Sequence, residues 1–442
     1  MKFYIQKLGC PKNDVDADYI TARLIEAGHS PVDDPSKADT IVVNTCGFVK
    51  DAKEESIDSI LELAQLKKRG RLKKLYASGC LTQRYGDEML SEMRELDGAF
   101  GIGALDAIAE AVTGGTVSRK AIRQDTRKLA YLDWRNRAVT DRLPFAYVKI
   151  SDGCDRKCSY CAIPQMRGKY RSRPARSILN EARYLADQGK TELILVSQEA
   201  TLWGTDLAGR PTLVKLLDQL GAVDGIKWIR LLYLHPARTG PELIEQMAGG
   251  GKILSYFDLP LQHVSTPILR RMKRESNRST IERLLGDIRD RAPQATIRVS
   301  FMVGFPGETK AQFKELCKFV AEQRFDRLGV FTYSAEEQTS AANLTGQLSQ
   351  KIKLERLDRL MTLQQGIAFE KNNSLIGTEV KVIIDARQPG GPALGRTSGD
   401  CPEIDQVVAV RGRGLRVGDI YRVEITGAEG YDLAGRKVTG KI

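Results

Sequence analysis

The sequence has no apolar run that approaches the length of about 20 residues needed to cross a lipid bilayer, and it has no low-complexity tract or coiled-coil heptad. The first residues, from Met1 to Lys7, lack the apolar region and the small-residue cleavage site of a signal peptide. These absences exclude an integral membrane protein. They predict a soluble protein of the cytoplasm that makes no contact with a membrane.

Length and charge limit the function classes further. A chain of 442 residues predicts two to four domains with sizeable cores. Its net charge of +12 favours a polyanionic neighbour such as RNA or the ribosome, and a basic surface that is simply solvated is the alternative. The same two interpretations apply to the dense basic run from Lys67 to Lys74.

Three of the eight cysteines, Cys154, Cys158 and Cys161, form a C-x3-C-x2-C pattern within one short loop. Thiolate-rich sites select zinc or iron–sulfur clusters, and no second C-x2-C pair follows to close a typical zinc site. Three protein thiolates on a cubane cluster leave one iron open for a substrate. A zinc loop completed by a distant histidine is the alternative, and the chain has three histidines: His29, His235 and His263.

The amino-terminal part alternates between expected strands and helices, which predicts an α/β domain with a parallel sheet. Cys10, Cys46 and Cys80 each come just after an expected strand and beside a glycine. Because the carboxyl ends of parallel strands line one edge of a sheet, the three thiols could converge on a second cluster. Burial as small hydrophobic residues is the alternative for each of them.

From about Leu143, six strand–helix units predict a parallel barrel whose active site lies at the carboxyl ends of its strands. Polar residues follow these expected strands: Gln198, Glu199, Tyr233, His235, Gln262, His263 and Glu308. Arg298 lies within the expected fifth strand. Taken singly, His263 could cap a strand end and Arg298 could form an outward ion pair.

After an expected helix from Gln350 to Asn372, short alternating segments predict a small antiparallel barrel of the OB-like class. The predicted domains are therefore residues 1–116, a linker over 117–142, a core domain over 143–374 and a terminal barrel over 375–442. The fold class is α/β with an added β-barrel.

Four sequence motifs, together with this order of domains, resemble the radical S-adenosylmethionine (SAM) methylthiotransferases over essentially the whole chain. They are Gly-Cys-Pro-Lys-Asn at 9–13, Asn-Thr-Cys-Gly-Phe at 44–48, Cys-Asp-Arg-Lys-Cys at 154–158 and Arg-Gly-Lys-Tyr-Arg-Ser-Arg at 167–173. The motifs resemble the branch that modifies a ribosomal protein more than the transfer RNA branch. The resemblance implies a partial (βα)6 TIM-like barrel as the core and a TRAM domain as the terminal barrel.

The resemblance also implies the cofactors and the residues that hold them. Cys154, Cys158 and Cys161 would bind a [4Fe-4S] cluster whose open iron chelates SAM. Cys10, Cys46 and Cys80 would bind a second [4Fe-4S] cluster that delivers sulfur. The predicted SAM contacts are Tyr160, Gln198, Glu199 and Arg298. No side chain is assigned as a catalytic acid or base, and Cys317 and Cys401 are interpreted as structural.

The function implied is insertion of sulfur and a methyl group at the β-carbon of an aspartate in small-subunit ribosomal protein S12, free or in the ribosome. The reaction would require an electron donor such as flavodoxin or ferredoxin. The protein would also make some contact with RNA. Two alternatives stay open, methylthiolation of a modified adenosine in tRNA and a non-catalytic RNA-binding module with a metal centre. Asp14, Glu199 and Gln338 depart from the pattern of the ribosomal-protein branch.

Overall fold

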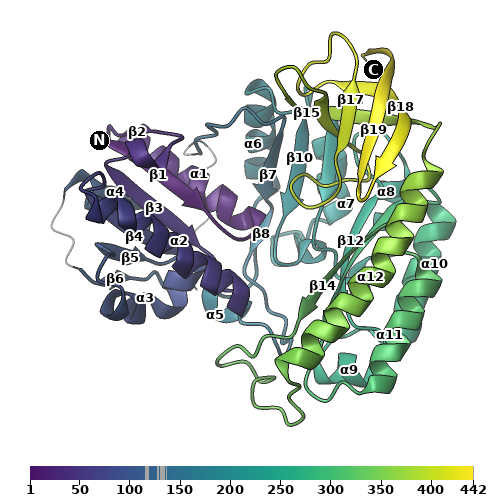
Figure 1. Cartoon of the computed structure of the whole chain (residues 1–442), viewed down its shortest axis with the longest axis horizontal. Helices are drawn as coiled ribbons and strands as arrows, with labels where there is room; N and C mark the ends of the chain where they lie inside the picture. The colour runs from purple at the N-terminus through teal and green to yellow at the C-terminus, as the bar shows by residue number, and fades with distance from the viewer. Residues whose placement is uncertain (115–118, 127–128, 130–134, 136, 442) are drawn as a thin grey trace. The chain divides into compact units, whose positions relative to one another are not determined.

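The computed structural model describes residues 1–114, 119–126, 129, 135 and 137–441. The chain divides into two compact units (Figure 1), and several segments far apart in sequence belong to the same unit. The first unit comprises Met1–Asp141, Ser151–Arg173 and Glu336–Ala342. The second comprises Arg142–Ile150, Pro174–Ala335 and Asn343–Ile442. The linker predicted over 117–142 lies partly outside the described residues.

The first unit is built on a six-stranded, all-parallel sheet in the order β2-β1-β3-β4-β5-β6. Its strands are β1 (Lys2–Lys7), β2 (Ser30–Pro31), β3 (Thr40–Thr45), β4 (Lys74–Gly79), β5 (Gly98–Phe100) and β6 (Ala121–Ile122). Its helices are α1 (Pro11–Glu26), the 3-10 turn η1 (Pro35–Lys37), α2 (Lys50–Lys68), α3 (Cys80–Glu92) and α4 (Leu105–Thr113). The predicted alternation of strands and helices is confirmed.

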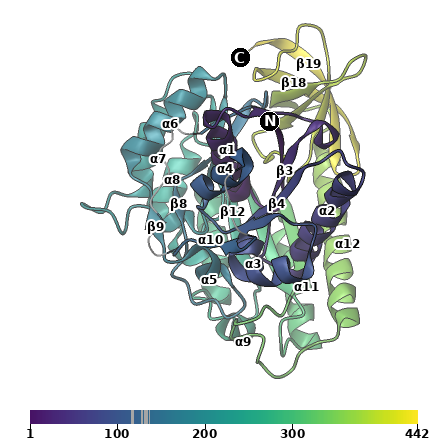
Figure 2. The ribbon, with the colours of Figure 1, turned by 90° about the vertical axis from the view of Figure 1, so that its left-hand side faces the viewer.

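Helices cover both faces of this sheet. Every residue of β3 is buried, as the continuous β-branched run Thr-Ile-Val-Val predicts for a central parallel strand. Ile41 and Leu75 pack with residues of α2 and α3 on one face. Tyr76 points to the other face, where its hydroxyl donates to the Ala111 carbonyl of α4. Figure 2 shows α1 and α4 on one side of β3 and β4 and α2 on the other.

The C-x3-C-x2-C segment folds with the first unit. It includes the short antiparallel pair β8 (Ser151–Asp152) and β9 (Arg171–Ser172), with α5 (Ile163–Arg167) between them. The backbone amide of Ala341 donates to the Ser159 carbonyl at 2.8 Å, which ties residues 336–342 to the same segment. The sequence predicts this segment as part of the core domain, so its packing with the amino-terminal unit is a tertiary feature.

The second unit contains six parallel strands in two three-stranded sheets, ordered β11-β10-β7 and β12-β13-β14. The strands are β7 (Phe145–Lys149), β10 (Glu192–Val196), β11 (Trp228–Leu231), β12 (Tyr256–Gln262), β13 (Thr296–Val303) and β14 (Arg327–Thr332). A parallel bridge between Ile229 and Ile253 links the two halves, so the curved wall is a partial barrel. The predicted six-stranded core is confirmed.

Helices cover this core. They are α6 (Ala175–Asp187), α7 (Leu213–Gly221), α8 (Pro241–Ala248), α9 (Thr266–Arg271), α10 (Arg278–Arg291), α11 (Lys310–Gln323) and α12 (Gln350–Ser374), with the 3-10 turns η3 (Ala200–Leu202) and η4 (Pro236–Arg238). Asn277 and Thr280 form a capping box that fixes the start of α10. Figure 1 shows α10, α11 and α12 beside the sheet that contains β12 and β14.

A closed five-stranded barrel ends the chain, in the order β15-β16-β17-β19-β18. Its strands are β15 (Glu379–Arg387), β16 (Ala393–Thr397), β17 (Val408–Arg411), β18 (Ile420–Glu429) and β19 (Asp432–Lys441). The expected small barrel is present, but its pairing is mixed because β17 and β19 run parallel. In the part of the chain that is described, no helix is long and apolar enough to span a membrane.

Buried ion pairs join this barrel to the core of the second unit. Glu192 on β10 accepts from Arg230 at 2.9 Å and from Arg396 of β16 at 2.8 Å. Both arginines and the glutamate are almost fully buried. Removing the Glu192 charge would leave Arg230 without its ion-pair partner in a low dielectric, which is strongly destabilising, whereas Arg396 also pairs with Asp385. The barrel is therefore an integral part of the second unit.

Candidate metal-cluster sites

Three cysteines follow three neighbouring strands of the first unit. Cys10 precedes Pro11 at the start of α1, Cys46 follows β3, and Cys80 begins α3 directly after β4. Because β1, β3 and β4 are adjacent and parallel, their carboxyl ends lie at the same edge of the sheet. The strand order thus brings together three thiols that lie 36 and 34 positions apart in the sequence.

These three thiols influence one another electrostatically. Burial raises the pKa of Cys46 to about 12, and the neighbouring Cys80 and Cys10 add to the rise. Burial also raises the pKa of the Cys80 thiol, with the Arg167 guanidinium acting against the rise and Cys10 acting with it. Binding to a metal deprotonates a cysteine thiol outright. A cluster would therefore overcome the resistance of these buried thiols to losing their protons.

Glycines next to the cysteines let the backbone approach closely at this edge. Gly9 has φ +91°, and a Cβ added there would lie 2.6 Å from the Cys46 Cβ and 3.0 Å from its sulfur. Gly79 has φ +99°, and its Cβ would lie 2.6 Å from the Thr45 carbonyl oxygen. Only glycine fits these two positions, for both conformational and steric reasons. Three converging thiols in a cradle that excludes other side chains fit an iron–sulfur cluster.

Two further polar side chains reach Cys80. The Asn13 amide nitrogen donates to the Leu8 and Thr45 carbonyls at 2.9 and 3.1 Å, which leaves its oxygen 3.7 Å from the Cys80 sulfur. Arg167, from the end of α5, donates to the same sulfur at 3.4 Å. Both residues belong to the motifs at 9–13 and 167–173, but the sequence alone indicates no role for either of them. Arg167 is 87 positions from Cys80, so no local pattern connects them.

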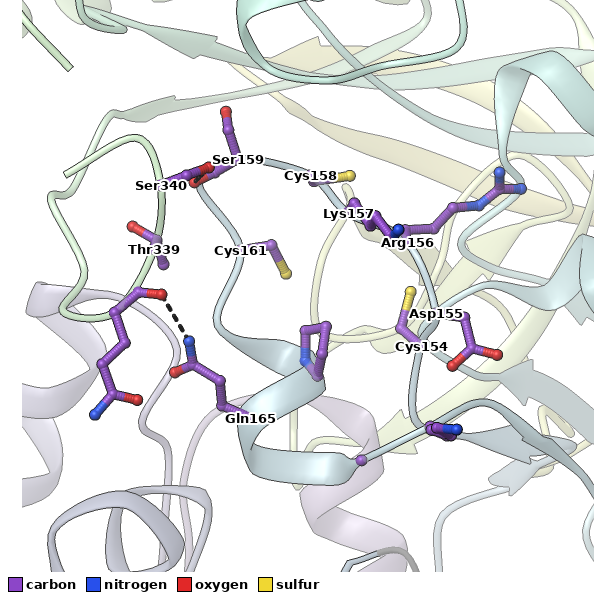
Figure 3. A pocket seen from close by; sticks show the side chains of 14 residues that line it. Cys154, Asp155, Arg156, Lys157, Cys158, Ser159, Cys161, Gln165, Thr339 and Ser340 are labelled. Carbon is purple, nitrogen blue, oxygen red and sulfur yellow. Dashed lines mark hydrogen bonds between the residues drawn. The ribbon is translucent and has the colours of Figure 1, made fainter. Parts of the chain in front are cut away.

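The second group of cysteines lies on the loop between β8 and α5. Cys154, Cys158 and Cys161 line a cavity of about 410 Å³ together with residues of α5 and of the segment 338–340. Figure 3 shows the three cysteines projecting from successive parts of the loop that curves around this cavity. Cys154 is buried, and the other two are half-buried. The cavity gives these three thiols the space that an inorganic cluster requires.

The segment 336–342 closes one side of this cavity. The Gln165 side chain donates to the Gln338 carbonyl at 2.9 Å, as the dashed line in Figure 3 marks. The segment is anchored by Glu336, which is 2% exposed and pairs with Lys53 and Arg84 at 2.8 Å each. Gln338 has φ +62°, a left-handed conformation that favours glycine. This conformation explains why a glycine suits the position better than the glutamine present in this chain.

Neither group of cysteines is arranged around a single ion. Among the residues that the structure describes, no group of three or more His, Cys, Asp or Glu side chains could hold one metal ion. Zinc needs its ligands within about 2.3 Å of one point, whereas each iron of a cubane takes its own thiolate.

Two of the predicted SAM contacts, Gln198 and Glu199, lie just after the end of β10 in the second unit. Both polar atoms of the Gln198 side chain are buried without a hydrogen-bond partner. Such an amide is rare in a protein interior and fits a ligand that supplies both a donor and an acceptor. Glu199 is buried and accepts from the Thr201 hydroxyl at 2.6 Å. Tyr160, the remaining contact predicted near the cysteines, lies half-buried directly before Cys161 in the first unit.

Arg298 has a different environment from the one expected. It is the third residue of the eight-residue strand β13, near the amino end of that strand. Its guanidinium pairs with Asp258 at 2.8 Å and with Asp405 of the terminal barrel at 3.4 Å. A ligand at the carboxyl ends of the strands would be distant from this position. The ion-pair alternative describes this residue better than the role of a SAM contact.

Other residues at the strand ends are also strongly constrained. Tyr233 and Gln262 both have positive φ, at 63° and 70°. His263 is fully buried and its Nδ1 accepts from the Ser265 amide at 2.9 Å, as expected of a residue that caps a strand end. Its Nε2 lies 3.6 Å from Glu308, whose other oxygen pairs with Arg356 at 3.0 Å. These contacts stabilise the rim of the partial barrel.

Two cysteines, Cys317 and Cys401, belong to neither of the two cysteine groups. Cys317 lies on α11, and burial raises the pKa of the Cys401 thiol in the terminal barrel.

The lysines of the basic run form ion pairs with acidic residues: Lys67 and Lys74 with Asp97, Lys68 with Glu95, and Lys73 with Asp39. These pairs offset much of the charge of the run. They favour the interpretation as a solvated helix end over a surface for RNA.

Three families match successive parts of the chain. The "Uncharacterized protein family UPF0004" matches residues 2–101, the Radical SAM superfamily matches residues 148–320, and the TRAM domain matches residues 376–438. The first match covers Cys10, Cys46 and Cys80, and the second covers the other three cysteines of the two groups.

Curated proteins named "Ribosomal protein uS12 methylthiotransferase RimO" are similar over nearly the whole chain. The protein from Heliobacterium modesticaldum is 41% identical over 438 residues, which is 99% of this chain and 95% of that protein. The protein from Desulforamulus reducens is 44% identical over 432 residues, covering 97% of each.

Solved structures share the fold at low sequence identity. The radical SAM methyltransferase TsrM from Kitasatospora setae matches with a TM-score of 0.56 and 15% identity, over 74% of this chain and 72% of that one. The cobalamin-dependent SAM radical enzyme OxsB matches with a TM-score of 0.50 and 12% identity, over 84% of this chain and 56% of that one. These matches confirm the fold class of the chain.

Proposed function

The chain belongs to the family of ribosomal protein uS12 methylthiotransferases named RimO, and on this premise we propose that it inserts a methylthio group at the β-carbon of an aspartate of uS12. It is accordingly a radical SAM enzyme. One observation carries the proposal: the first unit holds two separate groups of three cysteines, one at the edge of the parallel sheet and one on the loop before α5. Methylthiolation needs both a radical and a source of sulfur, and two clusters would supply the two.

Each group of cysteines would hold one [4Fe-4S] cluster. Cys154, Cys158 and Cys161 would hold the cluster that binds SAM, and the amino-terminal group would hold the second. When bound, the first cluster supplies the electron that cleaves SAM to a radical, and the second carries the sulfur that is transferred. The protein's own contribution is to keep one iron of each cluster free of protein ligands, because each group offers only three thiols.

Three side chains, Tyr160, Gln198 and Glu199, are proposed to bind and orient SAM. The buried, unpartnered amide of Gln198 supports a hydrogen-bonding role toward SAM, and Tyr160 and Glu199 are the other contacts that we retain. The segment 336–342, anchored by Glu336, would limit the access of water to the cavity of the cysteine loop. Exclusion of water protects a reactive radical from side reactions.

The partners and the domain boundaries follow from the same proposal. The substrate would be uS12, free or in the ribosome, and the terminal barrel, which matches the TRAM domain, supports contact with RNA. Flavodoxin or ferredoxin would supply electrons, and the protein would act in the cytoplasm where ribosomes are found. We propose boundaries at residues 1–116, 117–142, 143–374 and 375–442.

The test measures iron content and product together. Anaerobically reconstituted protein should contain about eight irons, and variants with alanine at Cys10, Cys46 and Cys80, or at Cys154, Cys158 and Cys161, about four each. The first variant should still cleave SAM under strong reduction but form no methylthio product, and the second should do neither. The uS12 protein and tRNA are offered as competing substrates and analysed by mass spectrometry. Product only on tRNA, or four irons in the wild type, would refute the proposal.

A further inference from the structure

Arg167 connects the two groups of cysteines. It is the last residue of α5, six positions after Cys161, and its side chain is 1% exposed. From there its guanidinium reaches the edge of the parallel sheet and donates to the Cys80 sulfur at 3.4 Å. A charged side chain buried this deeply must be compensated by its neighbours. Those neighbours show what the arginine does.

Four groups surround the guanidinium, and all belong to the first unit. One terminal nitrogen, Nη2, lies 2.9 Å from the Asn13 oxygen, 2.9 Å from Asp16 and 3.4 Å from the Cys80 sulfur. The other, Nη1, lies 3.3 Å from Asp152, at the end of β8. Nη2 has two hydrogens for three acceptors, so the sulfur and the two oxygens share them. Asp16 and Asp152 fix the arginine, and the sulfur receives part of its hydrogen bonding.

A buried cation at this distance affects a metal cluster in two ways. A hydrogen bond to a cysteine sulfur and a nearby positive charge both favour the cluster state with more negative charge, which is the reduced state. The same hydrogen bond fixes the orientation of the ligand. Replacing a side chain that hydrogen-bonds to a metal-binding residue commonly lowers the affinity for the metal 10 to 100 times. Asn13 and Arg167 contact the Cys80 sulfur and would hold this ligand in the same way.

We propose that Arg167 is a positioning residue that holds Cys80 as a cluster ligand and raises the reduction potential of the cluster bound by Cys10, Cys46 and Cys80. This inference rests on the proposed function, because it requires a cluster at the amino-terminal cysteines. Because α5 directly follows the loop with Cys161, Arg167 links that loop to the Cys80 thiol. No transfer of protons or atoms is involved.

The test uses the full-length chain with alanine at Cys154, Cys158 and Cys161, so that only the amino-terminal cluster contributes to the signal. The potential of this parent is measured by redox titration followed by electron paramagnetic resonance. Arg167→Met should lower the equilibrium constant for one-electron reduction at least tenfold, which is about 59 mV. Arg167→Lys keeps the charge and should recover much of this shift. Asp16→Asn removes an opposing charge and should shift the potential upward.

A matched control separates this effect from a loss of folding. Arg137 is also a buried arginine of the first unit, and its guanidinium pairs with Asp18 at 2.9 Å. Arg137→Met should leave the potential unchanged. Loss of iron in Arg167→Met but not in Arg137→Met would support the positioning role. Unchanged iron and potential in Arg167→Met would overturn the inference while leaving the proposed function intact. A parent without iron would overturn both.

Discussion

Replacing Gly9 with alanine should selectively disrupt the amino-terminal cysteine group. The new Cβ would lie 2.6 Å from the Cys46 Cβ, a separation that real Cβ atoms essentially never show, so Cys46 or the Gly9 backbone must move. The left-handed backbone at φ +91° adds about 1–2 kcal/mol of strain for alanine. Overpacking of a close contact costs about 1–3 kcal/mol more. The two effects together amount to about 2–5 kcal/mol, concentrated at one ligand.

The control is Gly28→Ala in the same unit. Gly28 has φ +82°, but a Cβ there would meet nothing within 4 Å. This variant therefore has the backbone strain of about 1–2 kcal/mol without the steric contact. The difference between the two variants, about 1–3 kcal/mol, isolates the contact with Cys46.

The measurement is iron and sulfide content after anaerobic reconstitution, together with thermal unfolding. Gly28→Ala should retain about eight irons, and Gly9→Ala should fall toward about four, because one cluster would lose a correctly placed ligand. Cleavage of SAM, which the proposed function assigns to the other three cysteines, should persist in both. If Gly9→Ala retained eight irons and unfolded like Gly28→Ala, the close packing of Gly9 on Cys46 would not matter for the cluster, and this reasoning would be refuted.

Three further predictions concern other parts of the chain. Gln338→Gly should stabilise the protein against urea by about 0.5–1 kcal/mol, because it removes most of the left-handed strain at φ +62°, and a loss of stability would contradict this. Glu192→Ala should destabilise the second unit by about 3–5 kcal/mol and lower its melting temperature, because it leaves Arg230 buried without its carboxylate partner, whereas Arg396 keeps its ion pair with Asp385. Burial raises the pKa of Glu192, but Arg396 and Arg230 outweigh it and hold the pKa below the usual 4.5, so its contribution to stability is complete above that pH and is lost as the pH falls through the lowered pKa. The stability of the wild type should therefore fall as the pH drops below 4.5, and Glu192→Ala should flatten this pH dependence; an unchanged profile would show that the pair is not linked to folding. Cys317→Ala should leave iron and sulfide content unchanged, and a loss of iron would mean that Cys317 is a ligand.

Much of the fold could be predicted from the sequence because its signals are local. The alternation of apolar strands with amphipathic helices gave the parallel sheet of the first unit and the six core strands of the second. The positions of Cys10, Cys46 and Cys80 after expected strands were enough to predict their convergence, because parallel strands end at a common edge. The pairing of β17 with β19 was missed, because the register and direction of short strands depend on distant partners.

The places of the cysteines relative to the strands could be predicted from the sequence, whereas the residues around the candidate site could not. Arg298 was expected to contact SAM, but only the packed structure shows Asp258 and Asp405 beside it. The basic run from Lys67 to Lys74 left two interpretations open, and its acidic partners come from other segments of the chain. In both cases the charge of a residue is visible in the sequence, whereas the group that neutralises it is not.

The sequence by itself determined the chemistry of this protein: which side chains are thiols, how three of them are spaced within one loop, and where three others fall relative to the strands. The tertiary structure alone decided what stands beside each thiol. Gly9 must be glycine because Cys46 packs against it, and Arg167 acts on Cys80 because α5 packs near the end of β4. Spacing and periodicity are properties of neighbouring residues, but the electrostatic surroundings of a buried sulfur arise from residues that only folding brings together.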